Sequence, residues 1–253
     1  MFGSAMLDER GVRPGTMAPG QVHLGGGRGD VAVDGVTVTL MTVVSGVEVD
    51  FLRCQVSAGF TLRAGRSRSI PFEQPLPWET PFTHFAGGHL PAVSVRLRTT
   101  VTAGGQAHDV GVTAVTVHPT AGQWRVLDAA RQLGWAFPHC EVRQGTVPGV
   151  RQSDPFLQWF DCVVPHAPDL VRLTFVANPV GVDVLLDTKG TRGTRGTRDT
   201  EGTRDAEGTR GAKGTRGDRG TDAGLHQFAV RHDDEAADLA VLIEGCLSPS
   251  RAR

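Results

Sequence analysis

Tyrosine is absent from this 253-residue sequence, and methionine and tryptophan occur only four times each. Long apolar runs are also missing, and no stretch approaches the roughly 20 apolar residues that a membrane-spanning helix needs. The first 20 residues lack the continuous apolar core of a secretory signal peptide. We therefore expect a cytoplasmic protein without integral membrane association.

Cysteine is scarce and widely spaced, at Cys54, Cys140, Cys162 and Cys246. The sequence contains no Cys-x-x-Cys pair, which is the spacing typical of structural zinc sites and redox motifs. In a reducing cytoplasm we expect free thiols, with Cys54 and Cys162 packed as small hydrophobic side chains.

Charge of one sign is not in excess, because the formal net charge is −1. Such a chain has no global field that would recruit nucleic acid or an anionic membrane surface. We expect no nucleic-acid partner.

Motifs of catalysis are absent as well. The sequence has no Gly-x-Ser-x-Gly elbow, no His-Glu-x-x-His and no phosphate-binding Gly-x-x-x-x-Gly-Lys-Ser/Thr loop. His84 and His89 would meet if the loop between them folds back, whereas His139 and Cys140 are neighbours on a strand and point to opposite faces. Because metal ligands normally come in two tight clusters, we predict no metal, cofactor-binding or catalytic residues.

What the sequence does contain favours short strands. Val and Thr fit a pleated surface, and 33 Gly and 15 Pro residues supply turns. Apolar and polar residues alternate with period two from Val36 to Leu40, which is typical of a half-buried strand. Comparable signals predict strands over 21–24, 47–56, 60–62, 70–72, 93–101, 110–117, 137–147, 156–164, 170–177, 182–186 and 225–231.

Two helices and a rigid connector interrupt this series. Residues 75–81 hold three prolines and cannot form a central strand, so we expect an extended connector. Apolar residues at three-residue steps, Trp124, Leu127, Ala130 and Leu133, predict a helix from about 121 to 133 with one buried face. Residues 233–246 show helical spacing and predict a C-terminal helix.

These elements suggest two domains. We expect a frayed N-terminus over residues 1–17, a β-sandwich over 18–118 and a second β-sandwich over 119–248. The second domain contains an insert at 188–224 with six Gly-Thr-Arg copies. Because the insert has almost no apolar side chains to bury, we expect it to be disordered and tolerated as a surface loop.

The ordered series of segments resembles the bacterial sporulation-control family of arrestin-like proteins, the SpoOM type. The segments that carry this resemblance, with a Pro-Phe-x-Gln motif among them, lie at 21–26, 36–42, 70–72, 76–81, 95–101, 115–119, 126–129, 133–135, 155–160 and 182–187. The resemblance implies two arrestin-like β-sandwich domains in tandem and a regulatory or scaffolding role in the cytoplasm. It implies no catalytic residue. This sequence departs from the family in its first strand, which looks short or missing, and in the triplet insert.

We therefore expect a non-enzymatic adaptor that binds cytosolic protein partners in bacterial development or stress. Its binding surface would be a sheet edge that accepts an extended peptide, either the strand at 21–24 or strands at the domain junction. The alternative is a β-sandwich that binds carbohydrate or another small ligand, with Phe156, Trp159 and Phe160 as the aromatic cluster. On a strand, however, Trp159 faces away from both phenylalanines. A third alternative is an enzyme with dispersed acids such as Asp50, Asp154 and Asp161.

Overall fold

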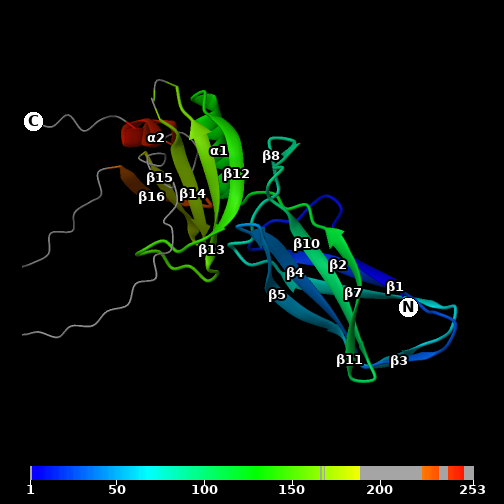
Figure 1. Ribbon diagram of the computed structural model, residues 1–253. Helices are drawn as coiled ribbons and strands as arrows, with labels where there is room; N and C mark the ends of the chain where they lie inside the picture. The colour runs from blue at the N-terminus through cyan, green and yellow to red at the C-terminus, as the bar shows by residue number, and fades with distance from the viewer. Residues whose placement is uncertain (1, 166, 168, 189–223, 234–238, 248–253) are drawn as a thin grey trace, which may run out of the picture.

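The computed structural model describes residues 2–165, 167, 169–188, 224–233 and 239–247 (Figure 1). Strands dominate the described chain, all neighbouring strands pair in antiparallel fashion, and two helices accompany them. The predicted all-β, arrestin-like fold class is confirmed. We call residues 2–118 the N-terminal half and residues 119–247 the C-terminal half. One continuous hydrophobic core runs through both halves.

The N-terminal half is a sandwich of two sheets. The first sheet has the order β1-β2-β7 and the second has the order β11-β10-β4-β5. Their bounds are β1 Phe2–Leu7, β2 Met17–Gly25, β7 Ser67–Pro75, β11 Gln106–Ala114, β10 Val95–Ala103, β4 Gly35–Val44 and β5 Val47–Ser57. Two short pairs complete this half, β3 Val31–Val33 with β6 Phe60–Leu62, and β8 His84–Phe85 with β9 Gly88–His89.

The N-terminus corrects one prediction. Residues 1–17 were expected to be frayed, yet β1 pairs with β2 along its whole length, from Phe2 opposite Gly25 to Leu7 opposite Gly20. Small residues make this possible. A Cβ atom on Gly111 would lie 2.2 Å from the Gly3 carbonyl oxygen, so β1 fits against β11 because position 111 is glycine.

The C-terminal half contains one five-stranded sheet in the order β12-β13-β14-β15-β16. The bounds are β12 Ala136–Gln144, β13 Phe156–Val163, β14 Val171–Ala177, β15 Gly181–Asp187 and β16 Leu225–Arg231. Helices α1, Ala121–Gln132, and α2, Leu239–Leu247, pack together beside this sheet (Figure 1). Within the described residues these helices form the second layer of this half.

Helix α1 begins as the sequence predicts but buries a different face. Thr120 caps its first turn in a capping box with Gln123. The buried positions include Val126, Leu127 and Ala130, whereas Trp124 is 40% exposed. Residues spaced by three drift around a helix, because each residue turns it by about 100°. Trp124 and Leu133 therefore lie on opposite sides.

The Gly-Thr-Arg insert falls almost entirely outside the described residues, and its predicted disorder stays a prediction. Its two ends do meet, since the Thr188 N–H donates to the Gly224 carbonyl at 2.8 Å. The insert thus joins β15 to β16 in a hairpin. The division into two domains at residue 118 also remains a prediction. No helix in the described part is long and apolar enough to cross a membrane.

Candidate functional site

The connector predicted at residues 75–81 lies at the junction of the two halves. It leaves β7 at Pro75 and is fixed at once, because Leu76 N–H donates to Thr16 O and Gly15 N–H donates to Leu76 O, both at 3.0 Å. Thr80 closes a turn by donating both its N–H and its hydroxyl to Pro77 O. The connector is therefore a rigid arm that presents its next side chains to the C-terminal half.

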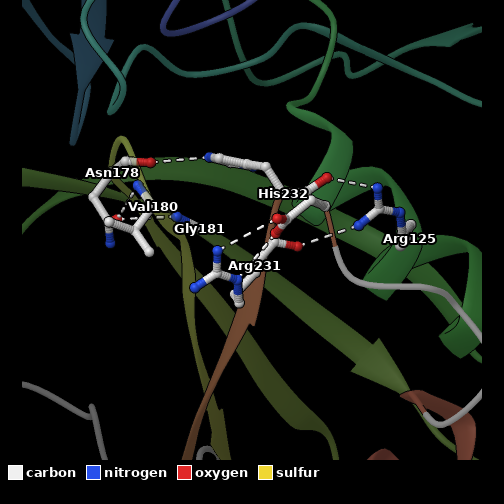
Figure 2. A network of polar contacts seen from close by, with 7 residues as sticks. Arg125, Asn178, Val180, Gly181, Arg231 and His232 are labelled. Atoms are coloured by element: carbon white, nitrogen blue, oxygen red, sulfur yellow. Dashed lines mark hydrogen bonds and ion pairs between the residues drawn. The ribbon is translucent and has the colours of Figure 1, made fainter.

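Trp78 is the first anchor of this junction. Its indole lies over Gly15, where a Cβ atom would come within 2.4 Å of the ring. Its ring also stacks on His232 with centroids 4.9 Å apart. Figure 2 shows how His232 is held: its Nε2 bonds to Asn178 O at 2.9 Å, and Arg125 donates to its carbonyl at 2.6 Å. Trp78 thus ties the N-terminal half to α1 and to the end of β16.

Glu79 is the second anchor. Its carboxylate accepts the backbone N–H groups of Ser153 and Asp154 at 2.6 and 2.9 Å. Burial and the neighbouring Glu79 charge raise the pKa of the Asp154 carboxyl above its usual value. A cleft of about 370 Å³ lies here, and Trp78, Glu79, Asp154 and Asn178 are among its lining residues.

Phe82 and Gln158 form the third anchor. Phe82 is fully buried and stacks on Phe160 at 5.4 Å. The Gln158 amide accepts from Phe82 N at 3.0 Å and donates to Phe82 O at 2.9 Å, so one side chain pairs with the connector as a strand would. The chain at residues 79–82 therefore meets the chain at residues 153–160 at this junction, and these stretches overlap two of the segments that carry the family resemblance.

Most sheet edges among the described strands are protected against pairing with another strand. Thr113 on β11 bonds through its hydroxyl to Ala5 O on β1, so these two edges cover each other. Strand β5 has two register irregularities against β4 and carries charged residues such as Glu48 and Asp50. Both devices discourage strand addition.

Prolines and a cap protect two further edges. Strand β7 contains Pro71 and Pro75, which have no N–H to donate. Strand β12 contains Pro138 beside a register irregularity, and its Val142 carbonyl accepts the Ser45 N–H at 2.9 Å.

Strand β16 is capped at one end, where the Arg231 carbonyl accepts from the Arg125 guanidinium at 3.2 Å, but from Leu225 to Ala229 the described residues give its edge none of these devices. It pairs with β15 in unbroken register, contains no proline, and has Arg231 as its one charged residue. Hydrogen bonds join Thr188 to Gly224 and His232 to Val180 at its two ends. Because hydrogen-bonded pairs alternate in antiparallel strands, the even-numbered residues bond to β15. Leu225, Gln227 and Ala229 direct their N–H and C=O groups outward, where the described part of the chain has no further strand.

The sheet topology corrects the predicted binding edge at residues 21–24. Residues 21–24 lie within β2, which has β1 on one side and β7 on the other. That strand has no free edge. The alternative prediction, a binding edge at the strands of the junction, stays a prediction; His232, next to β16, contacts Trp78 there.

The structure brings His84 and His89 together, as a folded loop would require. They are a cross-strand pair of β8 and β9 with ring centroids 5.0 Å apart, and His118 lies 6.1 Å from His84. Among the described residues no group of three or more His, Cys, Asp or Glu side chains has a geometry that could hold a metal ion. The cluster was missed because His118 is distant in sequence.

The other singled-out residues are dispersed. Phe156 and Phe160 belong to the main core, whereas Trp159 packs on the opposite face of the sheet. Asp50 pairs with Arg98, and Asp161 pairs with Arg172 at 3.3 Å. His139 is exposed while Cys140 is buried.

Comparisons with known proteins point to a single protein family. The family model described as SpoOM protein matches residues 4–191. The crystal structure of Spo0M, a sporulation control protein from Bacillus subtilis, has a TM-score of 0.72 and 20% sequence identity, covering 97% of each chain. A DNA-bound alkylpurine DNA glycosylase from Pseudomonas fluorescens covers 46% of this chain and 30% of its own at 18% identity; its TM-score of 0.30 is too low to support an argument. No curated protein matches the chain.

Proposed function

The chain belongs to the SpoOM protein family, and from this premise we propose that it is a non-enzymatic scaffold of bacterial development or stress. Membership in a sporulation-control family supports a regulatory role. We further propose that it acts in the cytoplasm by binding an extended segment of a protein partner along β16.

The observation that carries this proposal is the edge of β16, which is unprotected from Leu225 to Ala229 in the described chain. Backbone N–H and C=O groups that point outward bind an extended peptide as an added strand, and main-chain hydrogen bonds supply the affinity. Leu225 is 50% exposed on this strand and offers an apolar contact to such a segment. The junction supports β16 as the binding edge, since Arg125 and Trp78 hold the Arg231 end of this strand in place.

The test is affinity capture from the native cytosol with three baits: the unchanged chain, Gln227→Pro and Gln227→Thr. Proline removes the outward N–H of Gln227 without removing a bond to β15. Threonine keeps that N–H and suits a strand, so it is the matched control. Circular dichroism and thermal unfolding check that each bait is folded.

We expect a specific partner that both the unchanged chain and Gln227→Thr retain and that Gln227→Pro loses. A partner retained equally by Gln227→Pro would contradict binding at β16. No specific partner with the unchanged chain would contradict the scaffold proposal itself.

A small-ligand module is the second candidate, and the cleft beside Glu79 and Asp154 favours it. Its volume of about 370 Å³ falls in the range of small-molecule sites. Because Trp78 lines this cleft, a bound sugar or other small ligand should change the tryptophan fluorescence. Unchanged fluorescence over a panel of such compounds would remove this candidate.

A further inference from the structure

We propose that β16 pairs with β16 of a second copy of this chain when no partner is bound. This inference rests on the proposed function, because it assigns a second occupant to the same edge. The paired strands would run antiparallel about a two-fold axis at Gln227. The two five-stranded sheets would then form one continuous sheet.

The backbone of β16 is complementary to itself in this register. Gln227 would face Gln227 of the second copy, and Leu225 would face Ala229 on either side of the axis. All three residues direct their N–H and C=O groups away from β15. Each facing pair can therefore exchange both of its backbone hydrogen bonds, as hydrogen-bonded antiparallel pairs do. A two-fold interface requires this kind of self-complementary surface.

Charge also permits the pairing. Arg231 is the one charged residue of β16, and the two-fold axis places the two copies of Arg231 at opposite ends of the paired strands. Arg231 is already paired with Asp233 at 3.0 Å. A formal net charge of −1 gives two copies little long-range repulsion. No like charges therefore face each other across the axis.

Side chains on both faces of the strand add contacts. On the core face, Phe228 would lie beside His226 of the second copy, and both residues are half-buried in one copy. On the outer face, Leu225 would lie over Ala229 of the second copy. One edge accepts one strand, so the dimer and the partner complex exclude each other. Self-pairing would then keep the edge covered until a partner segment displaces the second copy.

The test changes the residue on the axis. In Gln227→Lys two ammonium groups would meet across the axis, and in Gln227→Glu two carboxylates would meet. Gln227→Thr is the uncharged control. The side chain of Gln227 is exposed, so these changes leave the pairing with β15 intact. Analytical ultracentrifugation of each full-length purified protein over a wide concentration range gives the dimer dissociation constant.

We expect dimers for the unchanged chain and for Gln227→Thr. Each charged variant alone should dissociate about tenfold or more readily, because like charges placed opposite each other in an interface are strongly unfavourable. An equimolar mixture of Gln227→Lys and Gln227→Glu should dimerise again. This recovery is specific to a two-fold axis at residue 227.

A monomer at every concentration overturns the inference, as do dimers that neither charge affects or a mixture that stays monomeric. These results do not contradict the proposed function if the unchanged chain captures a partner that Gln227→Pro does not. Conversely, a dimer that shows the charge pattern, together with no captured partner, supports self-pairing and contradicts the scaffold proposal.

Discussion

Gln74 and Gln158 are both buried, with 2% and 7% of their surface exposed, yet their amides are in opposite situations. The Gln158 amide bonds to the backbone of Phe82 and to Cys140 Sγ. Neither amide atom of Gln74 has a hydrogen-bond partner in the described structure. Burying an amide without partners costs about 1–3 kcal/mol, so the two residues should respond differently to the same substitution.

Gln74→Met is predicted to raise the free energy of unfolding by about 1 kcal/mol or more, since it removes an unpaired amide and keeps the side-chain volume. Gln158→Met should lower it by about 1–3 kcal/mol, because the Phe82 backbone groups lose their partner. Urea unfolding of both variants measures the difference. A loss of stability in Gln74→Met would mean that an ordered water satisfies this amide.

The four cysteines are all free thiols but differ in accessibility. Burial raises the pKa of the Cys140 thiol to about 12 and also raises the pKa of Cys162. Because the thiolate is the reactive form, Cys140 should react much more slowly at neutral pH than an accessible thiol. Cys54 is only partly buried.

Alkylation with iodoacetamide followed by peptide mapping checks this order. We predict that Cys54 is modified first, and that Cys140 and Cys162 are modified only after unfolding in urea. Rapid modification of Cys140 or Cys162 in the folded protein would show that the core around β12 and β13 opens.

The β8–β9 hairpin holds two histidines of the cluster and packs against the C-terminal half. Phe85 of β8 contacts Trp124 on α1 and Phe137 on β12, with centroids 5.1 and 6.1 Å away. Burial, then His89 and His118, lower the pKa of His84. His118 also bonds to Arg10 O, and Thr83 bonds to His84 Nδ1. As the pH falls, His84 is therefore protonated at a higher pH in the unfolded chain than in the folded chain.

Stability should consequently fall as the pH decreases from the ordinary histidine pKa of about 6.5. His84→Gln is predicted to make the urea midpoint less dependent on pH between about 7.5 and 5.5, because it removes this proton uptake. His108→Gln, at an exposed histidine on β11, is the matched control and should behave like the unchanged chain. Equal pH dependence in all three proteins would contradict the effect.

Strands whose apolar residues alternate were predictable from the sequence. β4 and β10 follow that rule, because one of their faces lies in the core and period two records it. β1 has no such pattern, since the small residues Gly3, Ser4 and Ala5 stand where large apolar side chains would alternate with polar ones. A sheet without β1 would have β2 at its border, which is why the predicted edge at residues 21–24 was wrong. The connector was predictable, since three prolines restrict it in any surroundings.

The free edge of β16 could not be predicted from the sequence. Which residues direct their N–H groups outward depends on the register with β15, and the ends of that register lie 36 residues apart, at Thr188 and Gly224. The absence of a neighbouring strand is a property of the whole sheet. The same holds for Gln158, whose role depends on a connector 76 residues away.

At the scale of the whole molecule, the junction determines how β16 is presented. Trp78, Glu79 and Phe82 each contact a different part of the C-terminal half, so the two halves are held at three separate places. The β16 edge lies at the far side of the five-stranded sheet from β12, the strand that Ser45 of the N-terminal half caps (Figure 1). A strand added at β16 therefore extends the sheet away from the N-terminal half.

The insert can be removed without disturbing the two ends that it joins. Thr188 and Gly224 already bond to each other, so residues 189–223 can be replaced by Asn-Gly, which forms a tight hairpin turn. If the insert is flexible, closing its loop costs entropy that rises by about 0.6 kcal/mol per doubling of length. Shortening it should then raise the free energy of unfolding by about 2 kcal/mol, measured by urea unfolding.

The same deletion separates the insert from the edge. If the insert is only a tolerated loop, the shortened chain should keep the dimer of the unchanged protein and capture the same partner. Gln227→Pro introduced into the shortened chain should again abolish both, which makes it the control. A partner lost by deletion alone, from a chain that is still folded and dimeric, would assign binding to the Gly-Thr-Arg repeat. Recognition would then move from the backbone of β16 to the charged side chains of the insert.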